Sequence, residues 1–347
     1  MKGRAVSGDA AGTRQLDRRE FLARASVLGL GSLLGQPDRA MAAEPPPETT
    51  RIRLPHTPYI CLAPQYLAEE FFRQEGFSEW EYLPLGSRAG VEAVADGRAD
   101  ISMWDIHSAI PLLDAGKPLV LLAGVHAGCY QLFAADRVKA IRDLKGKTAA
   151  VHYFGGGDHV LLSSMLAYVG VNPAQEVNWI TGRGARNAMD VFADGEADAF
   201  VAFAQEPAEL RAKKVGHVIL QTSLDRPWSQ YFCCMVVANR DFVQRHPVAT
   251  KRVLRSILKA ADICASEPER VARFLSDMRY ETRYPIGLEV MKGSLYTRWR
   301  EANPEDTLRF HALRLREAGM LKSTPQKLIA QGTDWRFLNE LKKELKG

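Results

Sequence analysis

The chain has 347 residues, of which 46% are apolar and 25% charged, and a formal net charge of +5; this excludes a chain that is disordered throughout and suffices for two lobes of ordinary size. Residues 1–42 carry seven Lys and Arg against four Asp and Glu, so the remaining residues have a net charge of only +2. Because no basic stripe with interleaved aromatic residues remains, we expect no nucleic-acid partner.

Residues 1–42 have the pattern of a cleaved export signal. A charged start is followed by about a dozen mildly apolar residues, 23–34, and by the small-residue site Ala-Met-Ala at 40–42. This apolar run is shorter than the roughly 20 residues of a permanent membrane span. The motif Arg-Arg-Glu-Phe-Leu at 18–22 resembles the twin-arginine signature, and no cysteine follows the run to carry a lipid. We therefore expect export of a folded, periplasmic protein without a lipid anchor; the alternative is an amphipathic N-terminal helix that stays attached.

After a proline-rich linker, residues 43–50, short strand-like runs alternate with amphipathic helical runs. The run "RIRL" at 51–54 predicts a strand, and residues 65–74 predict a helix with Leu67, Phe71 and Phe72 on one face. This alternation is typical of α/β proteins.

An internal repeat indicates the architecture. The segment "GSRAGVEAVADGRAD" at 86–100 aligns without gaps on "GARNAMDVFADGEAD" at 184–198. Each copy predicts a loop, a helix, a glycine stop and then a strand. Two copies, fewer than a solenoid needs, indicate two similar α/β lobes; the alternative is chance similarity between two helix–glycine–strand joints.

Two further strand-like runs are predicted to connect the lobes. The run "YQLFAAD" at 130–136 leaves the first lobe, and "YFCCMVVAN" at 231–239 returns to it. We therefore expect the first lobe at 51–135 and the second at 136–230. Residues 231–347 are expected to return to the first lobe and to continue as a helical C-terminal extension.

The five cysteines are an odd number at scattered positions, so they predict no disulfide framework. Neighbouring residues of a strand face opposite sides, so Cys233 and Cys234 are poorly placed to bind one ion together, and packing is the expected role. Cys129 lies at the other connecting strand and can come close to them, but no familiar metal-ligand spacing is present. We expect no metal and no cofactor; the sequence leaves open whether Cys129 pairs with one of the two cysteines.

Several segments, taken in order, resemble one protein family. They are "APQYLAEEFFRQEGF", "AVADGRADISMW", "GKPLVLLAGV", "IRDLKGKTAAVHYFGGGDHVLLSSMLAYVG", "VFADGEADAFVAFAQEPAELRA" and "MVVANRDFVQRHP". The set covers most of residues 52–266 and resembles the nitrate/taurine/sulfonate and thiamine-precursor class of ABC-importer substrate-binding proteins, called SsuA/THI5-like. The resemblance implies a type II periplasmic binding protein fold, with two α/β lobes that are joined by two hinge strands and close on a small ligand. It also implies a monomer that passes its ligand to the permease and ATPase of an ABC importer.

Candidate site residues follow the predicted strands, because ligands of open α/β sheets bind beyond the carboxyl ends of the strands, near helix N-termini. The candidate ligand-binding residues are Thr57, Tyr59, Ser87, Arg88, Trp104, Asp105, Tyr153, Phe154, Asp158, Arg186, Phe203, Glu206 and Trp228. Each has a plainer interpretation: the aromatic residues can pack in the core, the acids can cap helices or face solvent near a helix start, and the arginines can lie on the surface.

Two ligand classes compete for this site. An anion such as an aliphatic sulfonate would need the serine and arginine candidates together with helix N-termini. A neutral or cationic N-heterocycle, such as a thiamine precursor, would need flat aromatic walls and the carboxylates of Asp105, Asp158 and Glu206. Because acidic and aromatic candidates outnumber the basic ones, we favour the second class.

An enzyme and a sensor are the alternatives to a transport protein. Pyrimidine synthases of the THI5 branch carry a "CCCFC" stretch near the position of "SQYFCCM", but Ser229, Gln230 and Tyr231 stand where three of its cysteines would be. The "GxSxG" elbow of a hydrolase is also absent from the sequence. We therefore expect a protein that is not an enzyme. A periplasmic sensor that presents its ligand to a membrane receptor would share every feature above.

Overall fold

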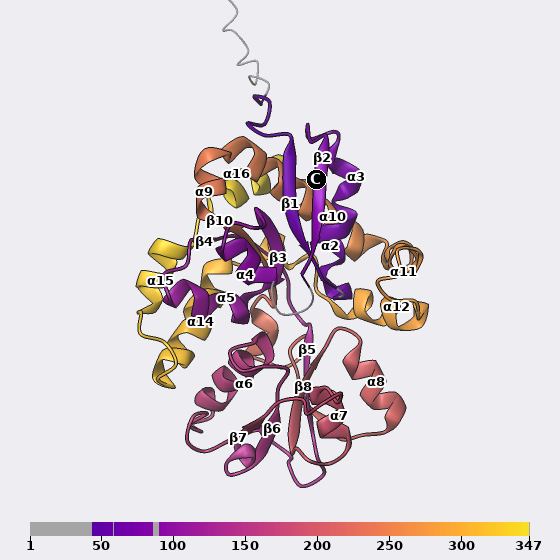
Figure 1. Cartoon of the computed structure of the whole chain (residues 1–347), viewed down its shortest axis with the longest axis vertical. Helices are drawn as coiled ribbons and strands as arrows, with labels where there is room; N and C mark the ends of the chain where they lie inside the picture. The colour runs from indigo at the N-terminus through magenta and orange to yellow at the C-terminus, as the bar shows by residue number, and fades with distance from the viewer. Residues whose placement is uncertain (1–43, 58, 86–89, 347) are drawn as a thin grey trace, which may run out of the picture. The chain divides into compact units, whose positions relative to one another are not determined.

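The first lobe is built from strands of both halves of the chain (Figure 1). We describe a computed structural model, in which residues 44–57, 59–85 and 90–346 are placed. The strands of this lobe are β1 (Arg51–His56), β2 (Glu79–Pro84), β3 (Ile101–Asp105), β4 (Leu119–His126) and β10 (Cys234–Asn239). β1 and β2 pair in parallel, whereas β10 lies between β3 and β4 and is antiparallel to both. The helical segments of the first lobe are η1 (Ile60–Leu62), α2 (Ala63–Leu67), α3 (Glu69–Phe72), α4 (Gly90–Ala95) and α5 (Ile106–Asp114).

The second lobe carries one five-stranded sheet in the order β7-β6-β8-β5-β9. Its strands are β5 (Tyr130–Ala134), β6 (Thr148–Ala150), β7 (Asn178–Ile180), β8 (Ala199–Phe203) and β9 (His217–Gln221). Its helical segments are η2 (Ile141–Leu144), α6 (Gly157–Tyr168), α7 (Ala188–Ala193), α8 (Glu206–Lys213) and η3 (Trp228–Gln230). The predicted α/β class and two-lobed architecture are confirmed.

The internal repeat corresponds to equivalent parts of the two lobes. Helix α4 begins at residue 90 and α7 at 188, and strand β3 begins at 101 and β8 at 199, so both elements recur after 98 residues. In each copy the last aspartate ties its strand to the neighbouring strand. Asp100 accepts the backbone N–H of Arg53 at 2.8 Å, and Asp198 accepts that of Thr148 at 2.8 Å. These aspartates therefore hold the sheets together.

The two predicted connecting strands are the inner antiparallel strands of the two sheets. β5 lies between β8 and β9, so residues 130–134 belong to the second sheet, whereas the sequence pattern predicts them at the end of the first lobe. β10 lies within the first sheet. The crossings themselves are the segments 127–129 and 222–233. Alternating apolar residues reveal a strand but not the sheet to which it hydrogen-bonds, which is why the boundary was misplaced.

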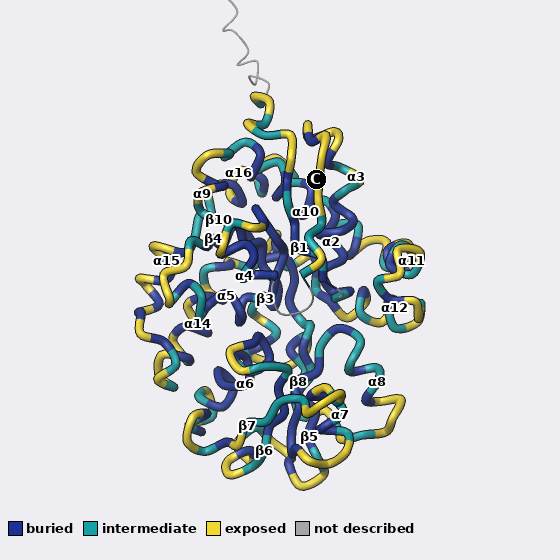
Figure 2. Tube along the Cα trace, viewed as in Figure 1, coloured by how far each residue is buried: buried dark blue, intermediate teal, exposed yellow. Residues whose placement is uncertain are grey.

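The N-terminal part of the first lobe also differs in detail from the prediction. Residues 65–74, expected as one helix, are divided between α2 and α3, with a break at Ala68. Leu67 and Phe72 are buried as expected, and Phe71 is partly buried against the same core. The central strands β3, β4 and β10 are almost entirely buried and appear dark blue in Figure 2.

The C-terminal extension is helical, as predicted, and contacts both lobes. Its helices are α9 (Arg240–Arg245), α10 (Pro247–Ser266), α11 (Pro268–Asp277), α12 (Tyr284–Gly293), α13 (Arg298–Glu301), α14 (Pro304–Glu317), α15 (Pro325–Gly332) and α16 (Arg336–Glu344). Helix α14 packs on α5 of the first lobe and α6 of the second. Its buried His311 lies 3.4 Å from His107 between the two Nε2 atoms, and its Nδ1 lies 3.1 Å from Ser164 Oγ. The extension therefore bridges the lobes beside the cleft.

None of the helices in the described part of the chain has the length and apolarity of a membrane span. The proposed export signal, residues 1–42, lies outside the described residues.

Candidate functional site

A pocket lies between the two lobes at the carboxyl ends of β3, β6 and β8. Its cavity volume is about 40 Å³ in this arrangement, which leaves room for a very small ligand or a few water molecules. The lining residues are Tyr59, Cys61, Leu62, Trp104, Asp105, Ser108, Cys129, Tyr130, His152, Tyr153, Gly157, Asp158, Phe203, Cys233 and Cys234. The position agrees with the rule that ligands of α/β sheets bind beyond strand ends.

Aromatic side chains close the pocket from both lobes. The ring of Tyr59, from the first lobe, meets that of Phe203, from the second, edge to face with centroids 4.9 Å apart. Trp104 lies behind Tyr59, with centroids 6.3 Å apart, and Tyr130 packs on Phe203 at 5.5 Å. The lobes are thus in contact, and aromatic rings form the apolar part of the cavity wall.

An imidazole between two carboxylates forms the polar side of the second lobe. His152 Nδ1 lies 2.8 Å from Asp158 Oδ2, and its Nε2 lies 2.8 Å from Glu206 Oε1. Burial by itself would lower the pKa of His152, but Glu206 and Asp158 outweigh it and raise the pKa to about 10. His152 is therefore an imidazolium at neutral pH, and the three groups together carry one net negative charge.

Asp105 supplies a second negative charge from the first lobe. It is the N-cap of α5 and accepts the Ser108 N–H at 3.0 Å and the Ser108 hydroxyl at 2.6 Å. Its side chain keeps 16% of its surface exposed. Burial, reinforced by the Asp105 charge, raises the pKa of Tyr153 above its usual value, so this neighbouring phenol stays neutral. Among the described lining residues there is no Lys or Arg.

Asp105 also contacts the start of helix α6 across the cleft. A methyl group built at Gly157 would lie 2.3 Å from Asp105 Oδ1 and 2.7 Å from its Cγ. Only a glycine therefore allows the two lobes to approach this closely at the pocket.

We expect Gly157→Ala to weaken ligand binding about tenfold or more, because overpacking costs about 1–3 kcal/mol and the clash exists only when the lobes meet. Calorimetric titration measures the affinity, and small-angle scattering measures lobe closure. Gly293→Ala is the matched control, because Gly293 is exposed and a methyl group there meets nothing within 4 Å. Equal ligand affinity in the two variants would contradict this account of closure.

Six of the candidate residues proposed from the sequence line the pocket. They are Tyr59, Trp104, Asp105, Tyr153, Asp158 and Phe203. Glu206 stands one step behind them, joined through His152. Ser87 and Arg88 lie outside the described residues.

The remaining four candidates lie elsewhere. The backbone N–H and C=O of Thr57 are both bonded to the Tyr66 hydroxyl, and the Phe154 ring is 61% exposed in the loop before α6. Arg186 is on the surface, paired with Asp194 and Glu196, so its plainer interpretation fits better. Trp228 is buried against α14, in a neighbouring small cavity.

His152 and the thiols of the pocket wall were missed as site residues. His152 follows β6 and immediately precedes Tyr153, so its position after a strand was the available signal.

The sulfur atoms of Cys233 and Cys234 are 3.7 Å apart, although we expected them on opposite faces. Cys233 precedes the strand and a register shift follows Cys234, so strict alternation does not apply there. Cys129 does approach Cys234, at 3.9 Å between sulfur atoms.

The architecture is that of the periplasmic binding proteins, as comparison with solved structures shows. The nitrate-binding protein NrtA of Synechocystis matches with a TM-score of 0.70 at 17% identity, over 87% of this chain and 90% of that one. The alkanesulfonate-binding protein SsuA of Xanthomonas axonopodis pv. citri matches with a TM-score of 0.63 at 17% identity, over 85% of this chain and 100% of that one.

The family follows from the sequence match. The family model described as "NMT1/THI5 like" matches residues 61–271, more than half of the chain, so this chain belongs to the NMT1/THI5-like family. The nitrate/nitrite binding protein NrtA of a Nostoc species is 24% identical over 274 residues, which are 69% of this chain and only 60% of that protein. The relatives named here are solute-binding proteins rather than enzymes, in agreement with the sequence-based expectation.

Proposed function

We propose that this chain is an extracytoplasmic solute-binding protein that captures a small cationic or neutral nitrogen-containing ligand between its lobes and delivers it to an ABC importer. The periplasmic binding protein fold and the relatives named for nitrate and alkanesulfonate binding support the solute-binding role. The twin-arginine motif in residues 18–22 supports export of the folded chain.

The charge of the pocket is the observation that carries the choice of ligand class. Asp105, Asp158 and Glu206 contribute three carboxylates and His152 one imidazolium, so these four groups sum to two negative charges. No Lys or Arg stands among the described lining residues to pair with an anion. In a partly dry cleft this charge favours a cation and opposes nitrate or a sulfonate.

The aromatic wall supports the same class. Tyr59, Trp104 and Phe203 present ring faces or edges to the cavity, and aromatic faces attract organic cations and stack on planar heterocycles. A ligand N–H group donates to a carboxylate such as Asp105, whose role as a helix cap leaves further lone pairs to accept it. The small cavity requires the lobes to open slightly around anything larger than a few atoms.

Transport then depends on the population of the closed form. A ligand that contacts Asp105 of the first lobe and Phe203 of the second stabilises the closed arrangement relative to the open one. The permease would recognise this closed form and the ATPase would drive uptake. Such a cycle needs no covalent chemistry, and we expect the binding protein to act as a monomer.

We expect a thermal-shift screen of the purified protein to select amines, quaternary ammonium compounds or N-heterocycles and to reject nitrate and alkanesulfonates. A ligand at about one hundred times its Kd adds about 2.7 kcal/mol to the stability of the protein. Hits are confirmed by calorimetry and by recovery of the unchanged ligand. Stabilisation by nitrate or sulfonates alone would refute the cationic assignment but keep the solute-binding role, whereas conversion of the ligand would refute both.

A further inference from the structure

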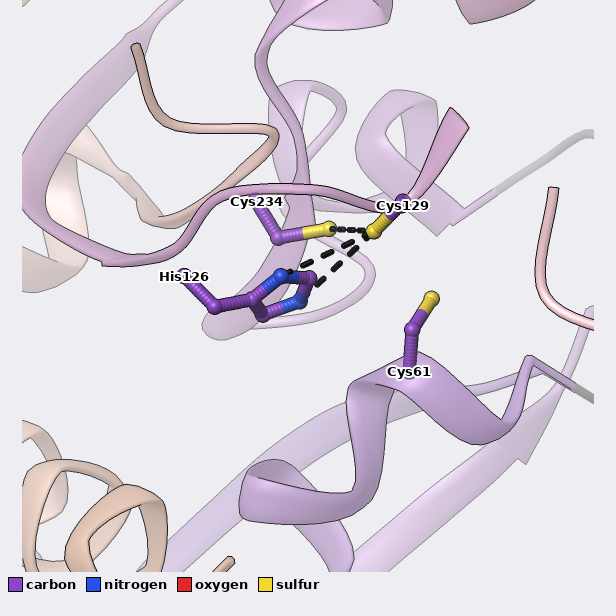
Figure 3. A group of neighbouring side chains, drawn as sticks. All are labelled: Cys61, His126, Cys129 and Cys234. Carbon is purple, nitrogen blue, oxygen red and sulfur yellow. Dashed lines mark hydrogen bonds between the residues drawn. The ribbon is translucent and has the colours of Figure 1, made fainter. Parts of the chain in front are cut away.

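Three cysteines and one histidine converge beneath the pocket from four separate segments. Cys61 comes from η1, His126 from the end of β4, Cys129 from the crossing 127–129, and Cys234 from the start of β10. Figure 3 shows the sulfur of Cys61 pointing up toward that of Cys129, and the Cys234 sulfur and the His126 ring turned to the same point. We propose that these four side chains bind one zinc ion, in addition to the ligand bound in the pocket.

The distances between the donor atoms approach those of a tetrahedral site. The Cys129 sulfur lies 3.9 Å from the Cys234 sulfur, and 3.6 and 3.9 Å from the two ring nitrogens of His126. One donor atom from each of the four residues lies within 4.8 Å of all the others. Tetrahedral zinc, with bonds of about 2.3 Å to sulfur and about 2.0–2.1 Å to nitrogen, separates its donors by about 3.6–3.8 Å. Only small side-chain shifts are needed to bind the ion.

The surrounding contacts hold the ligands in place. His126 Nδ1 lies 3.4 Å from the Ala127 carbonyl. In the tautomer that donates to this carbonyl, Nε2 is free to bind the metal, and a second-shell carbonyl of this kind is common for metal-bound histidines. The Tyr296 ring packs edge-on against His126 at 4.9 Å, and its hydroxyl donates to the Cys61 carbonyl at 3.1 Å. In the sheet, Cys234 is directly opposite His126. Tyr296 is therefore a positioning residue for two of the four ligands.

The chemistry of the donor set selects the metal class. Three thiolates and one imidazole suit zinc and similar borderline or soft ions, whereas calcium and magnesium require oxygen ligands. Cys61, His126 and Cys234 are buried and Cys129 is half-buried, so four protein ligands would enclose the ion as in structural zinc sites. Cys233 stands outside the set although its sulfur lies 3.7 Å from that of Cys234.

At this location a bound ion would have a structural role. Cys129 directly precedes β5 of the second lobe, whereas the other three ligands lie in the first lobe. A bound ion would fasten the start of the crossing to the first lobe and stiffen the pocket wall formed by Cys61, Cys129 and Cys234. This role does not depend on which solute the pocket binds.

Metal analysis of the full chain, expressed with zinc and purified without chelators, tests the proposal. We expect about one zinc ion per chain, removable by a strong chelator and restored by added zinc to the reduced protein. Cys61→Ser, Cys129→Ser and Cys234→Ser should each lower the zinc content to well below one ion per chain, because a structural zinc site needs its four protein ligands. Cys233→Ala and Cys264→Ala are matched controls, because both cysteines are buried but lie outside the set, and both variants should keep the ion.

Cobalt substitution tests the site in the wild-type chain and therefore does not depend on whether the serine variants fold. In the wild-type chain, Co²⁺ should give the intense thiolate charge-transfer bands of a tetrahedral sulfur-rich site, and added zinc should abolish them. Two results would overturn the proposal: wild-type protein that binds neither metal after reduction, or zinc retained in all three serine variants. Isolation of a metal-free chain with Cys129 and Cys234 joined as a disulfide that prevents uptake would overturn it as well.

Discussion

Asp105→Asn is expected to weaken binding of the cationic ligand about 10- to 100-fold, because a hydrogen bond to a charged group contributes about 1.5–3 kcal/mol. The substitution removes the charge but keeps the helix cap, since Asn and Asp are equally good N-caps and the Ser108 N–H retains its acceptor. The free energy of unfolding without ligand should therefore change much less than the free energy of ligand binding. Calorimetry and chemical denaturation measure the two quantities separately.

The matched control for Asp105 is Asp143→Asn in the second lobe. Asp143 also receives backbone N–H groups near a helix start, those of Lys139 and Ala140, but it does not line the pocket. Its replacement should leave the ligand affinity unchanged. If Asp105→Asn binds the cation as tightly as the wild type, or if it binds anions no better than before, the electrostatic basis of the proposed selectivity is wrong.

His152→Gln is expected to lower the free energy of unfolding by about 3 kcal/mol near neutral pH, because it leaves the Asp158 carboxylate, whose side chain is only 2% exposed, beside Glu206 without their shared cation. The loss of stability caused by His152→Gln should become smaller as the pH rises. The pKa of His152 is about 10 in the folded protein, against about 6.5 in the unfolded chain. Its stabilising contribution is therefore complete below about pH 6.5 and is lost as the pH rises toward 10.

Urea denaturation of the wild type and of His152→Gln across this pH range measures the contribution of His152 as the difference between their free energies of unfolding. The titration of tyrosines and cysteines is common to both proteins and cancels in this difference. His159→Gln, in helix α6, is the control. Burial lowers the pKa of His159, so its removal should leave the alkaline limb of the stability curve unchanged. A difference between wild type and His152→Gln that stays constant from about pH 6.5 to about pH 10 would disprove the charged state of His152.

Local sequence signals sufficed for much of the lobe architecture. The helix–glycine–strand pattern appears twice with the same spacing, and the structure places both copies at equivalent positions, down to the aspartates that bind the Arg53 and Thr148 N–H groups. Such signals are readable because helix stops and strand starts depend on neighbouring residues. For the same reason Tyr59, Trp104, Asp105 and Phe203, each next to the end of a strand or start of a helix, were found as pocket residues.

The sequence alone did not show which distant segments of the chain pair with one another. The assignment of Tyr130–Ala134 to the second sheet, the bridging of both lobes by α14 and the displacement of Trp228 from the pocket all depend on which elements meet in space. The irregularity after Cys234 likewise broke the alternation on which its side-chain direction was predicted.

By itself, the sequence determined the two α/β lobes, the helical extension and the acidic and aromatic character of the cleft, because each depends on local pattern or composition. Only the tertiary structure decided that His152 lies between Asp158 and Glu206 and that Cys61, His126, Cys129 and Cys234 meet at one point. The physical reason is the separation of these residues along the chain: donor atoms up to 173 positions apart (from 61 to 234) come within 4.8 Å only when β4, β10 and the crossing between the lobes are in place.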